Sequence, residues 1–405
     1  MWLNLAWKNL WRNKNRTAIT ISGIFFAMII SVTASSLQTG VFDNFIRNLV
    51  GYYTGYIQIH REGYWDHPEL DNALERNAGY ESAVKAQKNI TAMAPRIESY
   101  ALASFQDVTK GCMVVGISPE EENMITALKQ KISAGHYFTS GDAQSVLLAD
   151  GLSVRLKLGL GDTLYLIGQG YHGALAAGKY TIKGLLTFGS PELNDQLLFM
   201  PLGTAQEFFS APGLVTSYVI GMSSDKSLAQ TVSSLAEISG KGYEVMSWKE
   251  LLPDVDQHIR MDKGSMYIIL GILYLLICFG IFGTMLMMLA ERRHEMGMLV
   301  AVGMKKRKLA GLLLIESILA VLIGSALGLV CSIPLVWYLN RYPIRIGGEM
   351  AEAYKQFNFE PIFPASTDPS NFVTQGVIIV ALGILLSLYP VVTALRLDAV
   401  EAMKK

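Results

Sequence analysis

The sequence has 405 residues, of which 51% are hydrophobic and 17% charged, and its formal net charge is zero. The apolar content is too high for an ordinary soluble protein, and the charged content is too high for a chain that lies wholly in a membrane. Zero net charge gives no reason to expect nucleic acid, and three separated cysteines (Cys112, Cys278 and Cys331) provide neither a disulfide framework nor a cysteine metal site. The composition therefore predicts membrane helices combined with a soluble domain.

The chain begins with a basic segment, residues 1–16, that has no acidic residue. In a helix, one face would carry Leu3, Trp7, Leu10 and Trp11, so we expect a cytoplasmic amphipathic elbow helix. Residues 17–40 follow without charge and are long enough for a first transmembrane helix. A cleaved signal peptide is the alternative, because Val32-Thr33-Ala34 resembles a cleavage site.

Residues 41–263 contain no apolar run of membrane length and are predicted to be an autonomous extracytoplasmic α+β domain. Strand-like and helix-like segments alternate up to about residue 140, and again after about residue 212. Between them, residues 140–212 consist of short strands and turns. We interpret this part as a β-rich insertion.

Three more transmembrane helices are predicted at 264–290, 307–340 and 372–396. Residues 291–308, which follow the first of these three helices, contain six basic residues and two acidic ones. The positive-inside rule therefore places this segment in the cytoplasm. The domain 41–263 and the proline-rich loop 341–371 then lie outside, and the tail 397–405 lies inside. The predicted fold is a four-helix membrane protein with a large extracytoplasmic α+β domain.

The segment 291–306 has an ordered pattern of charged, apolar and glycine residues. Met296, Leu299, Val300 and Gly303 share one helical face, and Arg292, Arg293 and Glu295 lie beside it. A basic loop on anionic lipid is the simpler explanation, but it accounts only for the charge.

This pattern resembles the cytoplasmic coupling helix of the four-span ABC transporter permeases, which include lipoprotein-releasing, macrolide-efflux and cell-division members. Residues 6–17 and 390–402 are similar to that family at the two ends of the chain, although the family usually has proline where Ala399 stands. The resemblance implies a split extracytoplasmic domain and a coupling segment that contacts a separate ATPase through Glu291, Arg292, Arg293, Glu295, Met296, Gly297, Leu299, Val300 and Gly303.

No chemistry of its own is predicted for this chain. Residues 173–179 satisfy most of a phosphate-loop pattern, but Tyr180 replaces the magnesium-binding Ser/Thr and the following residues are strand-like. The six histidines are scattered, so no metal is expected, and no enzyme motif is present. ATP and Mg²⁺ would therefore be bound by two copies of a partner ATPase, and this chain would hold no cofactor.

Residues 36–42, 51–59 and 247–248 are similar to lipoprotein-releasing permeases, so lipoprotein release at the bacterial inner membrane, with the large domain in the periplasm, is the favoured function. Efflux of small amphipathic molecules, and mechanical activation of an extracytoplasmic partner without transport, remain open. A second permease chain, identical or homologous, is expected, because four spans are too few to enclose a path.

Two sets of membrane residues carry more specific expectations. The first helix is predicted to line a cavity for a lipid-modified or amphipathic substrate through Phe25, Met28, Val32 and Leu37, or to face lipid instead. Gly324 and Gly328 are predicted to allow a neighbouring helix to approach. Glu316, the lone charge in the apolar run 309–339 of the third span, should face the protein interior or reach the cytoplasmic interface.

Overall fold

A computed structural model describes residues 2–12, 14–139, 141–188, 190–349, 351–352, 362–398 and 402. Parts of the predicted elbow segment 1–16, loop 341–371 and tail 397–405 lie outside this set, including Ala399 of the C-terminal motif. The chain divides into two compact units. The membrane unit comprises residues 1–44, 259–345 and 362–405, and the α+β unit comprises residues 45–258 and 346–361.

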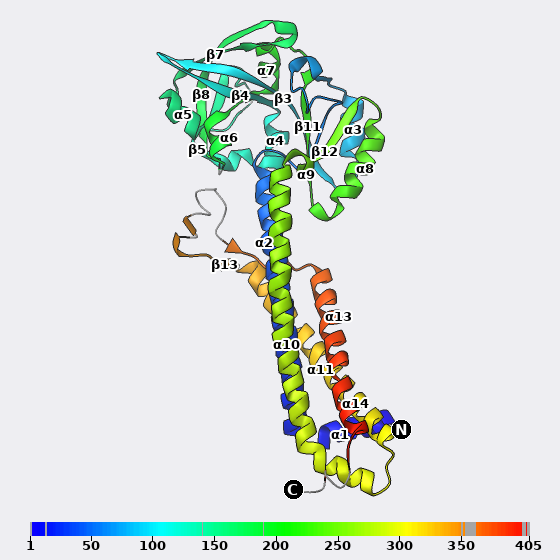
Figure 1. The fold of residues 1–405 in the computed structure, drawn as a ribbon. Helices are drawn as coiled ribbons and strands as arrows, with labels where there is room; N and C mark the ends of the chain where they lie inside the picture. Colours follow the sequence, from blue (N-terminus) through cyan, green and yellow to red (C-terminus); the bar gives the residue numbers. More distant parts are fainter. Residues whose placement is uncertain are drawn as a thin grey trace. The chain divides into compact units, whose positions relative to one another are not determined.

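The membrane unit is built from long apolar helices (Figure 1). These are α2 (Lys14–Tyr52), α10 (Pro253–Ala301), α11 (Lys306–Arg341) and the pair α13 (Pro369–Leu386) and α14 (Leu388–Leu395), preceded by the short α1 (Trp2–Arg12). Four stretches are long and apolar enough to cross a membrane: Thr17–Gly51, Pro253–Ala301, Lys306–Arg341 and Pro369–Leu395. The predicted combination of four membrane helices with an α+β domain is confirmed.

The helix boundaries differ from those predicted in one respect that matters for function. We expected a transmembrane helix 264–290 and a separate coupling helix 291–306, but α10 continues unbroken from Pro253 to Ala301. No glycine or proline interrupts the run of charged residues that follows Ala290, so the backbone has no reason to leave the helix there. The coupling segment is therefore the last part of a membrane helix.

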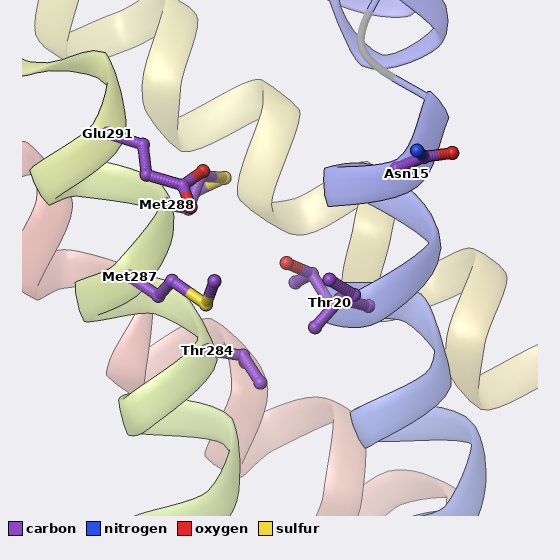
Figure 2. A pocket seen from close by; sticks show the side chains of 7 residues that line it. Asn15, Thr20, Thr284, Met287, Met288 and Glu291 are labelled. Carbon is purple, nitrogen blue, oxygen red and sulfur yellow. The ribbon is translucent and has the colours of Figure 1, made fainter.

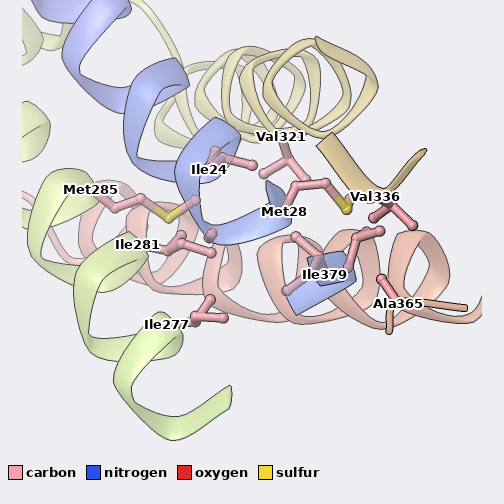
Figure 3. Close-up of a cluster of buried hydrophobic side chains, with 11 residues drawn as sticks. Ile24, Met28, Ile277, Ile281, Met285, Val321, Val336, Ala365 and Ile379 are labelled. Atoms are coloured by element: carbon pink, nitrogen blue, oxygen red, sulfur yellow. The ribbon is translucent and has the colours of Figure 1, made fainter. Parts of the chain in front are cut away.

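A hydrophobic core joins the four spans (Figure 3). It contains Ile24 and Met28 of α2, Ile281 of α10, Val321 of α11 and Ile379 of α13. Because the core draws on every span, the described helices form a packed bundle within a single chain.

Two glycines of α11 allow α2 to approach closely. A Cβ at Gly324 would lie 2.9 Å from Cβ of Ile24, and one at Gly328 would lie 2.7 Å from Cβ of Met28. Both separations are shorter than carbon atoms tolerate, so the contact depends on the missing side chains.

One buried amide connects three spans. Gln375 of α13 accepts hydrogen bonds through Oε1 from the Ser31 hydroxyl of α2 at 2.5 Å and from the Tyr274 hydroxyl of α10 at 2.7 Å. Gln375 is 4% exposed, so its side chain is shielded from lipid, and its oxygen is satisfied by two protein hydroxyls.

The α+β unit contains a ten-stranded mixed sheet (Figure 1). Its order is β12-β1-β11-β3-β4-β9-β6-β8-β5, and β7 pairs with β3 and β8. The strands are β1 (Ile57–Arg61), β3 (Ile90–Phe105), β4 (Val108–Ile117), β5 (Ile132–Gly135), β6 (Ser145–Ala149), β7 (Thr163–Gln169), β8 (Leu175–Leu186), β9 (Leu197–Pro201), β11 (Ser217–Met222) and β12 (Tyr243–Ser247). The helices of this unit are α3 (Ala78–Lys85), α4 (Pro119–Thr126), α5 (Asp150–Leu156), α6 (Pro191–Gln196), α7 (Leu202–Phe208), α8 (Leu228–Ser239) and α9 (Trp248–Leu251).

The predicted β-rich insertion at 140–212 does not form a sheet of its own. Its strand β9 pairs in parallel with β4, as at Val115 and Phe199, and β7 pairs with β3. The continuous apolar run of β4 is buried from Val114 to Ile117, as expected for a strand inside a sheet. The insertion therefore extends the main sheet.

A lysine within this unit makes its stability depend on pH. Lys131 donates from Nζ to the carbonyl oxygens of Gly51 at 2.7 Å and Thr126 at 2.5 Å, and burial lowers its pKa to about 7. Between that value and the ordinary lysine pKa of about 10.5, the unfolded chain holds a proton that the folded chain lacks. The folded state therefore gains stability as the pH rises through this window.

We predict that the isolated segment 45–258 unfolds cooperatively and that Lys131→Met removes this pH dependence. From pH 7.5 to 9.5, the free energy of unfolding of the natural segment should rise relative to that of the variant by about 1.4 kcal/mol per pH unit, because one proton is involved. Urea unfolding at several pH values measures this difference. Parallel pH profiles of the two segments would show that Lys131 does not titrate in this window.

Candidate functional site

The candidate site is a junction of three helices at the end of the membrane unit that contains α1. Glu316 of α11 is 1% exposed and lies at the centre of the junction. Its Oε1 accepts a hydrogen bond from Asn9 Nδ2 of α1 at 2.8 Å, and its Oε2 forms an ion pair with Arg292 Nη1 of α10. Both carboxylate oxygens are thus occupied by donors from different helices.

Arg292 lies where the prediction did not place it. We expected its charge to face a partner ATPase, but the residue is 8% exposed and its guanidinium is turned toward Glu316. A carboxylate inside a membrane span needs a partner, and Arg292 supplies the opposite charge. Within this chain Arg292 therefore links α10 to α11, and its contact with an ATPase stays a prediction.

Apolar packing reinforces the ion pair. Met296 is 3% exposed and belongs to a cluster with Leu309 and Leu313 of α11 and Ala394 of α14, against which Val300 also packs. We expected Met296 and Val300 to contribute to the docking face; here Met296 is buried and Val300 is partly buried, and their contact with an ATPase stays a prediction. These side chains are covered by α11 and α14 of the same chain, and Gly297 beside them is buried.

The turn that follows the coupling segment depends on a glycine. Gly303 has a φ of +107°, which favours glycine because it carries no Cβ. Amide N–H groups of Gly303 and Met304 donate to the carbonyl oxygens of Val300 and Leu299, each at 3.0 Å, and so cap the end of α10. The role of Gly303 is to end the helix and direct the chain into α11.

A different set of residues remains exposed on this segment. Met298, Leu299 and Val302 are 47%, 40% and 89% exposed, and Glu295 beside them pairs with Arg12 at 2.8 Å. We call these four residues, Glu295, Met298, Leu299 and Val302, the outer ridge. Three of its four residues are apolar, on a segment otherwise rich in exposed charge, including Arg293 and Lys305 to Lys308.

A crevice of about 240 Å³ separates α2 from α10 near the junction (Figure 2). Thr20 of α2 and Thr284 and Met287 of α10 face it, and Glu291 lies at one end. In the bundle core, Ile24 of α2 and Ile281 of α10 belong to one cluster (Figure 3). At the crevice the same two helices are separated. The last turns of α10 are therefore tied to the bundle through Arg292 and Met296.

The predicted substrate cavity along α2 is not open within this chain. Met28 is 1% exposed and Val32 is fully buried, and both belong to the bundle core (Figure 3). Close contact with α11 at Gly328 accounts for the burial of Met28. Phe25 and Leu37 are half-buried, and Leu37 packs against the same core. The exposed side chains of α2 in this region are Phe26 and Ile30, on its other face.

Two residues that form buried polar contacts between helices of the membrane unit were not assigned from the sequence. Asn9 was noticed only as part of a terminal motif, and Gln375 was not singled out. A lone polar side chain in an apolar span is a usable signal, and Gln375 and Glu316 both carry it. Nothing in the sequence, however, assigns Asn9 as the partner of Glu316.

The structure also shows how the side chains of α1 are exposed and where the residues of the phosphate-loop match lie. Trp7 and Trp11 are about half exposed and meet edge-to-face at 5.8 Å, whereas Leu10 is buried, so the face predicted for these residues is divided. Gly178 and Lys179 lie inside strand β8. Among the described residues, no three His, Cys, Asp or Glu side chains are grouped to hold a metal.

Comparison with known proteins adds the family context. Residues 17–238, more than half of the chain, match the family described as MacB-like periplasmic core domain, and residues 267–399 match FtsX-like permease C-terminal. The lipoprotein-releasing system transmembrane protein LolC of Neisseria meningitidis serogroup B is 21% identical over 403 residues, covering 96% of this chain and 94% of that protein.

Two further relatives carry the name MacB. The macrolide export ATP-binding/permease protein MacB 1 of Yersinia pestis bv. Antiqua is 25% identical over 414 residues, covering all of this chain and 60% of that protein. The solved periplasmic region of MacB from Actinobacillus actinomycetemcomitans is 15% identical with a TM-score of 0.36, covering 52% of this chain and 96% of that structure.

We predict that the Arg292–Glu316 pair behaves as a coupled unit. Arg292→Met should destabilise the membrane unit by about 3–5 kcal/mol because it strands a buried carboxylate, whereas Arg292→Met with Glu316→Met should recover most of that loss. Denaturant titration of the full chain in mixed micelles measures both.

The exposed pair Arg12–Glu295 is the matched control, since a pair of this kind contributes roughly 0–1 kcal/mol. Arg12→Met and Glu295→Met should therefore have small effects. A loss in the double variant equal to the sum of the losses in the Arg292 and Glu316 single variants would contradict coupling between them.

Proposed function

Because this chain belongs to the MacB-like and FtsX-like family of ABC transporter permeases, we propose that it couples ATP hydrolysis in a separate ATPase to the release of lipid-modified proteins from a membrane. The permease role follows from the family and from the four apolar helices. Lipoprotein release is favoured by the extent of the alignment with one relative. A relative named for a lipoprotein-releasing system aligns with nearly the whole of both chains.

The proposed setting is the bacterial inner membrane, with the α+β unit in the periplasm and the junction in the cytoplasm. The basic residues around the turn at Gly303 support this orientation through the positive-inside rule. The match of residues 17–238 to a periplasmic core domain is consistent with it. ATP and Mg²⁺ would then act on the side of the membrane that carries the junction, in a partner ATPase.

The outer ridge is the surface that we propose for the ATPase. It replaces the docking face expected from the sequence, since Met296 and Val300 pack inside this chain. Exposed Met298, Leu299 and Val302 provide apolar contact area, and Glu291, Arg293 and Glu295 lie on the same segment to orient it. Movement of the ridge would reach α11 through Arg292 and Glu316, because that pair links the two helices.

The working assembly is proposed to contain two permease chains and two ATPase copies. The bundle core of one chain is closed, so an amphipathic substrate would need a surface formed with a second, identical or homologous chain. Exposed apolar side chains on α2 and α10, such as Phe26, Ile30 and Phe279, can serve such an interface or face lipid.

Small-molecule efflux is the second candidate. It is favoured by the 25% identity to a macrolide export protein over the full length of this chain. Sequence identity of this size supports a shared architecture, and the substrate then has to be decided by experiment.

We predict that an acylated lipoprotein stimulates ATP hydrolysis by the chain reconstituted with its ATPase. The same protein with its lipid-bearing cysteine replaced by serine should not, because the lipid anchor is the feature to be extracted. Measured stimulation by both forms would instead favour a transducer that responds to a protein partner. Stimulation by a small amphipathic drug alone would favour efflux.

We further predict that Val302→Asp weakens binding of the ATPase. Val302 is 89% exposed, so the folded chain tolerates the substitution, while a carboxylate placed in an apolar contact should lower affinity about tenfold or more. Copurification and coupled ATP hydrolysis report the effect. Val154→Asp, at a valine 78% exposed in the α+β unit, is the matched control and should leave both unchanged. Full binding by the Val302 variant would remove the ridge from the contact.

A further inference from the structure

The α+β unit contains a cavity that the proposed transport cycle does not use. It has a volume of about 550 Å³ and is lined by side chains that include Tyr53, Tyr64, Trp65, Tyr100, Glu98 and Met113. The size suits a small organic molecule, and the lining is dominated by aromatic and aliphatic groups.

The aromatic side chains differ in how firmly they are held. Tyr64 is buried and stacks on His60, with the ring centroids 5.1 Å apart and the planes 9° from parallel. Trp65 and Tyr100 are 44% and 65% exposed and so remain available to a ligand. His60 adds no positive charge near pH 7, because burial lowers its pKa. Rings that are rigid or exposed in this way offer their electron-rich faces to a cation.

The carboxylate of Glu98 lies in the cavity lining, and only one of its two oxygens accepts hydrogen bonds from the described residues. Glu98 accepts through Oε1 from the Tyr53 hydroxyl at 2.6 Å and from Arg96 Nη1 at 3.3 Å. Within the part of the chain that the structure describes, Oε2 of Glu98 has no hydrogen-bond partner. Charged groups in apolar surroundings normally have their acceptors filled, so this oxygen is open to a donor.

Neighbouring positive charges do not balance Glu98. Arg96 is fully buried and forms a bidentate pair with Glu122. Its Nε donates to Glu122 Oε2 at 2.9 Å, and its Nη2 donates to Glu122 Oε1 at 2.7 Å. Lys131, the next cation, is held by two backbone carbonyls, and its pKa of about 7 leaves it only partly charged at neutral pH. Among the residues that the structure describes, no lysine or arginine lines the cavity, whereas Glu192 stands at its exposed edge. The cavity is therefore both apolar and negative.

We propose that this cavity binds a hydrophobic organic cation, that is, a primary amine or ammonium group attached to an apolar body. The ammonium group would donate to Glu98 Oε2, and the exposed rings of Trp65 and Tyr100 would contact the charge or the adjoining carbon atoms. An organic anion is disfavoured by Glu98 and Glu192, and a neutral molecule of the same shape lacks the positive charge that would pair with the carboxylate.

The test uses three photoreactive probes of one shape and different charge: 4-benzoylbenzylammonium, 4-benzoylbenzyl alcohol and 4-benzoylbenzoate. The full chain is placed in nanodiscs of zwitterionic lipid, labelled over a range of probe concentrations and mapped by mass spectrometry. The ammonium probe should label Met113 and its neighbours in the cavity with saturation, the alcohol should require about tenfold more probe, and the carboxylate should not label there.

Substitutions then assign the recognition to named groups. Glu98→Gln keeps the acceptor for Tyr53 but removes the charge, and should weaken the ammonium probe about tenfold while weakening the alcohol much less. Tyr100→Leu, at an exposed ring, should weaken the ammonium probe about two- to fivefold. Glu120→Gln, an exposed carboxylate outside the cavity lining, is the control.

Several results would overturn the proposal. Equal saturation by the ammonium and alcohol probes would show an apolar pocket without charge selection. Unchanged affinity of the ammonium probe in Glu98→Gln would remove the carboxylate from recognition. Labelling that never saturates, or that avoids Met113, would show that the cavity does not bind this class of molecule.

Discussion

A carboxylate within an apolar helix has to be neutralised, and the membrane unit is organised around the way this happens at Glu316. Its two oxygens take donors from α1 and α10, so a single side chain of α11 fixes two other helices. The pairing also sets the rotation of α10 about its axis. Once Arg292 points inward, Met296 and Val300, one turn and two turns further on, point inward with it and pack on α11. The exposed character of Met298 and Val302 is a consequence of the same rotation.

The rest of the bundle is held by contacts that suit a lipid environment. Close packing at Gly324 and Gly328 depends on the absence of side chains, and the amide of Gln375 joins three spans without a net charge. With the Glu316 junction near one end of the spans and the Gln375 contact elsewhere, the helices are linked at separate levels. A displacement at the end of α10 therefore acts on helices that resist sliding past one another, which is what transmission of force along a bundle requires.

The sequence was sufficient for the spans, because long uncharged runs have few other solutions, and for an α+β domain between the first two. It was not sufficient for the direction in which side chains face. Helical periodicity grouped Met296, Leu299, Val300 and Gly303 on one side, but it could not show that Leu309 and Ala394 would cover two of them. The same limit applies to Met28, which meets Gly328 some 300 residues away in the chain, and to Val32, which is buried in a core drawn from all four spans. In the α+β unit, local pattern indicated short strands in residues 140–212 but could not show that one of them, β9, pairs in parallel with β4.

Two buried arginines show how similar chemistry can serve different ends. Arg292 meets one carboxylate, Glu316, whose second oxygen is filled by the neutral Asn9, so the charges at that pairing cancel. Arg96 meets two carboxylates, and although burial acts to lower its pKa, Glu122 and its neighbours raise it, so that the guanidinium stays charged. One of those carboxylates, Glu122, is buried and satisfied, whereas the other, Glu98, lines a cavity. A balanced pair costs least where no water or ligand can enter, as within a membrane bundle. An excess carboxylate is stable only where water or a positive group can reach it, and this difference in charge balance is why Glu316 suits a structural junction and Glu98 suits a binding site.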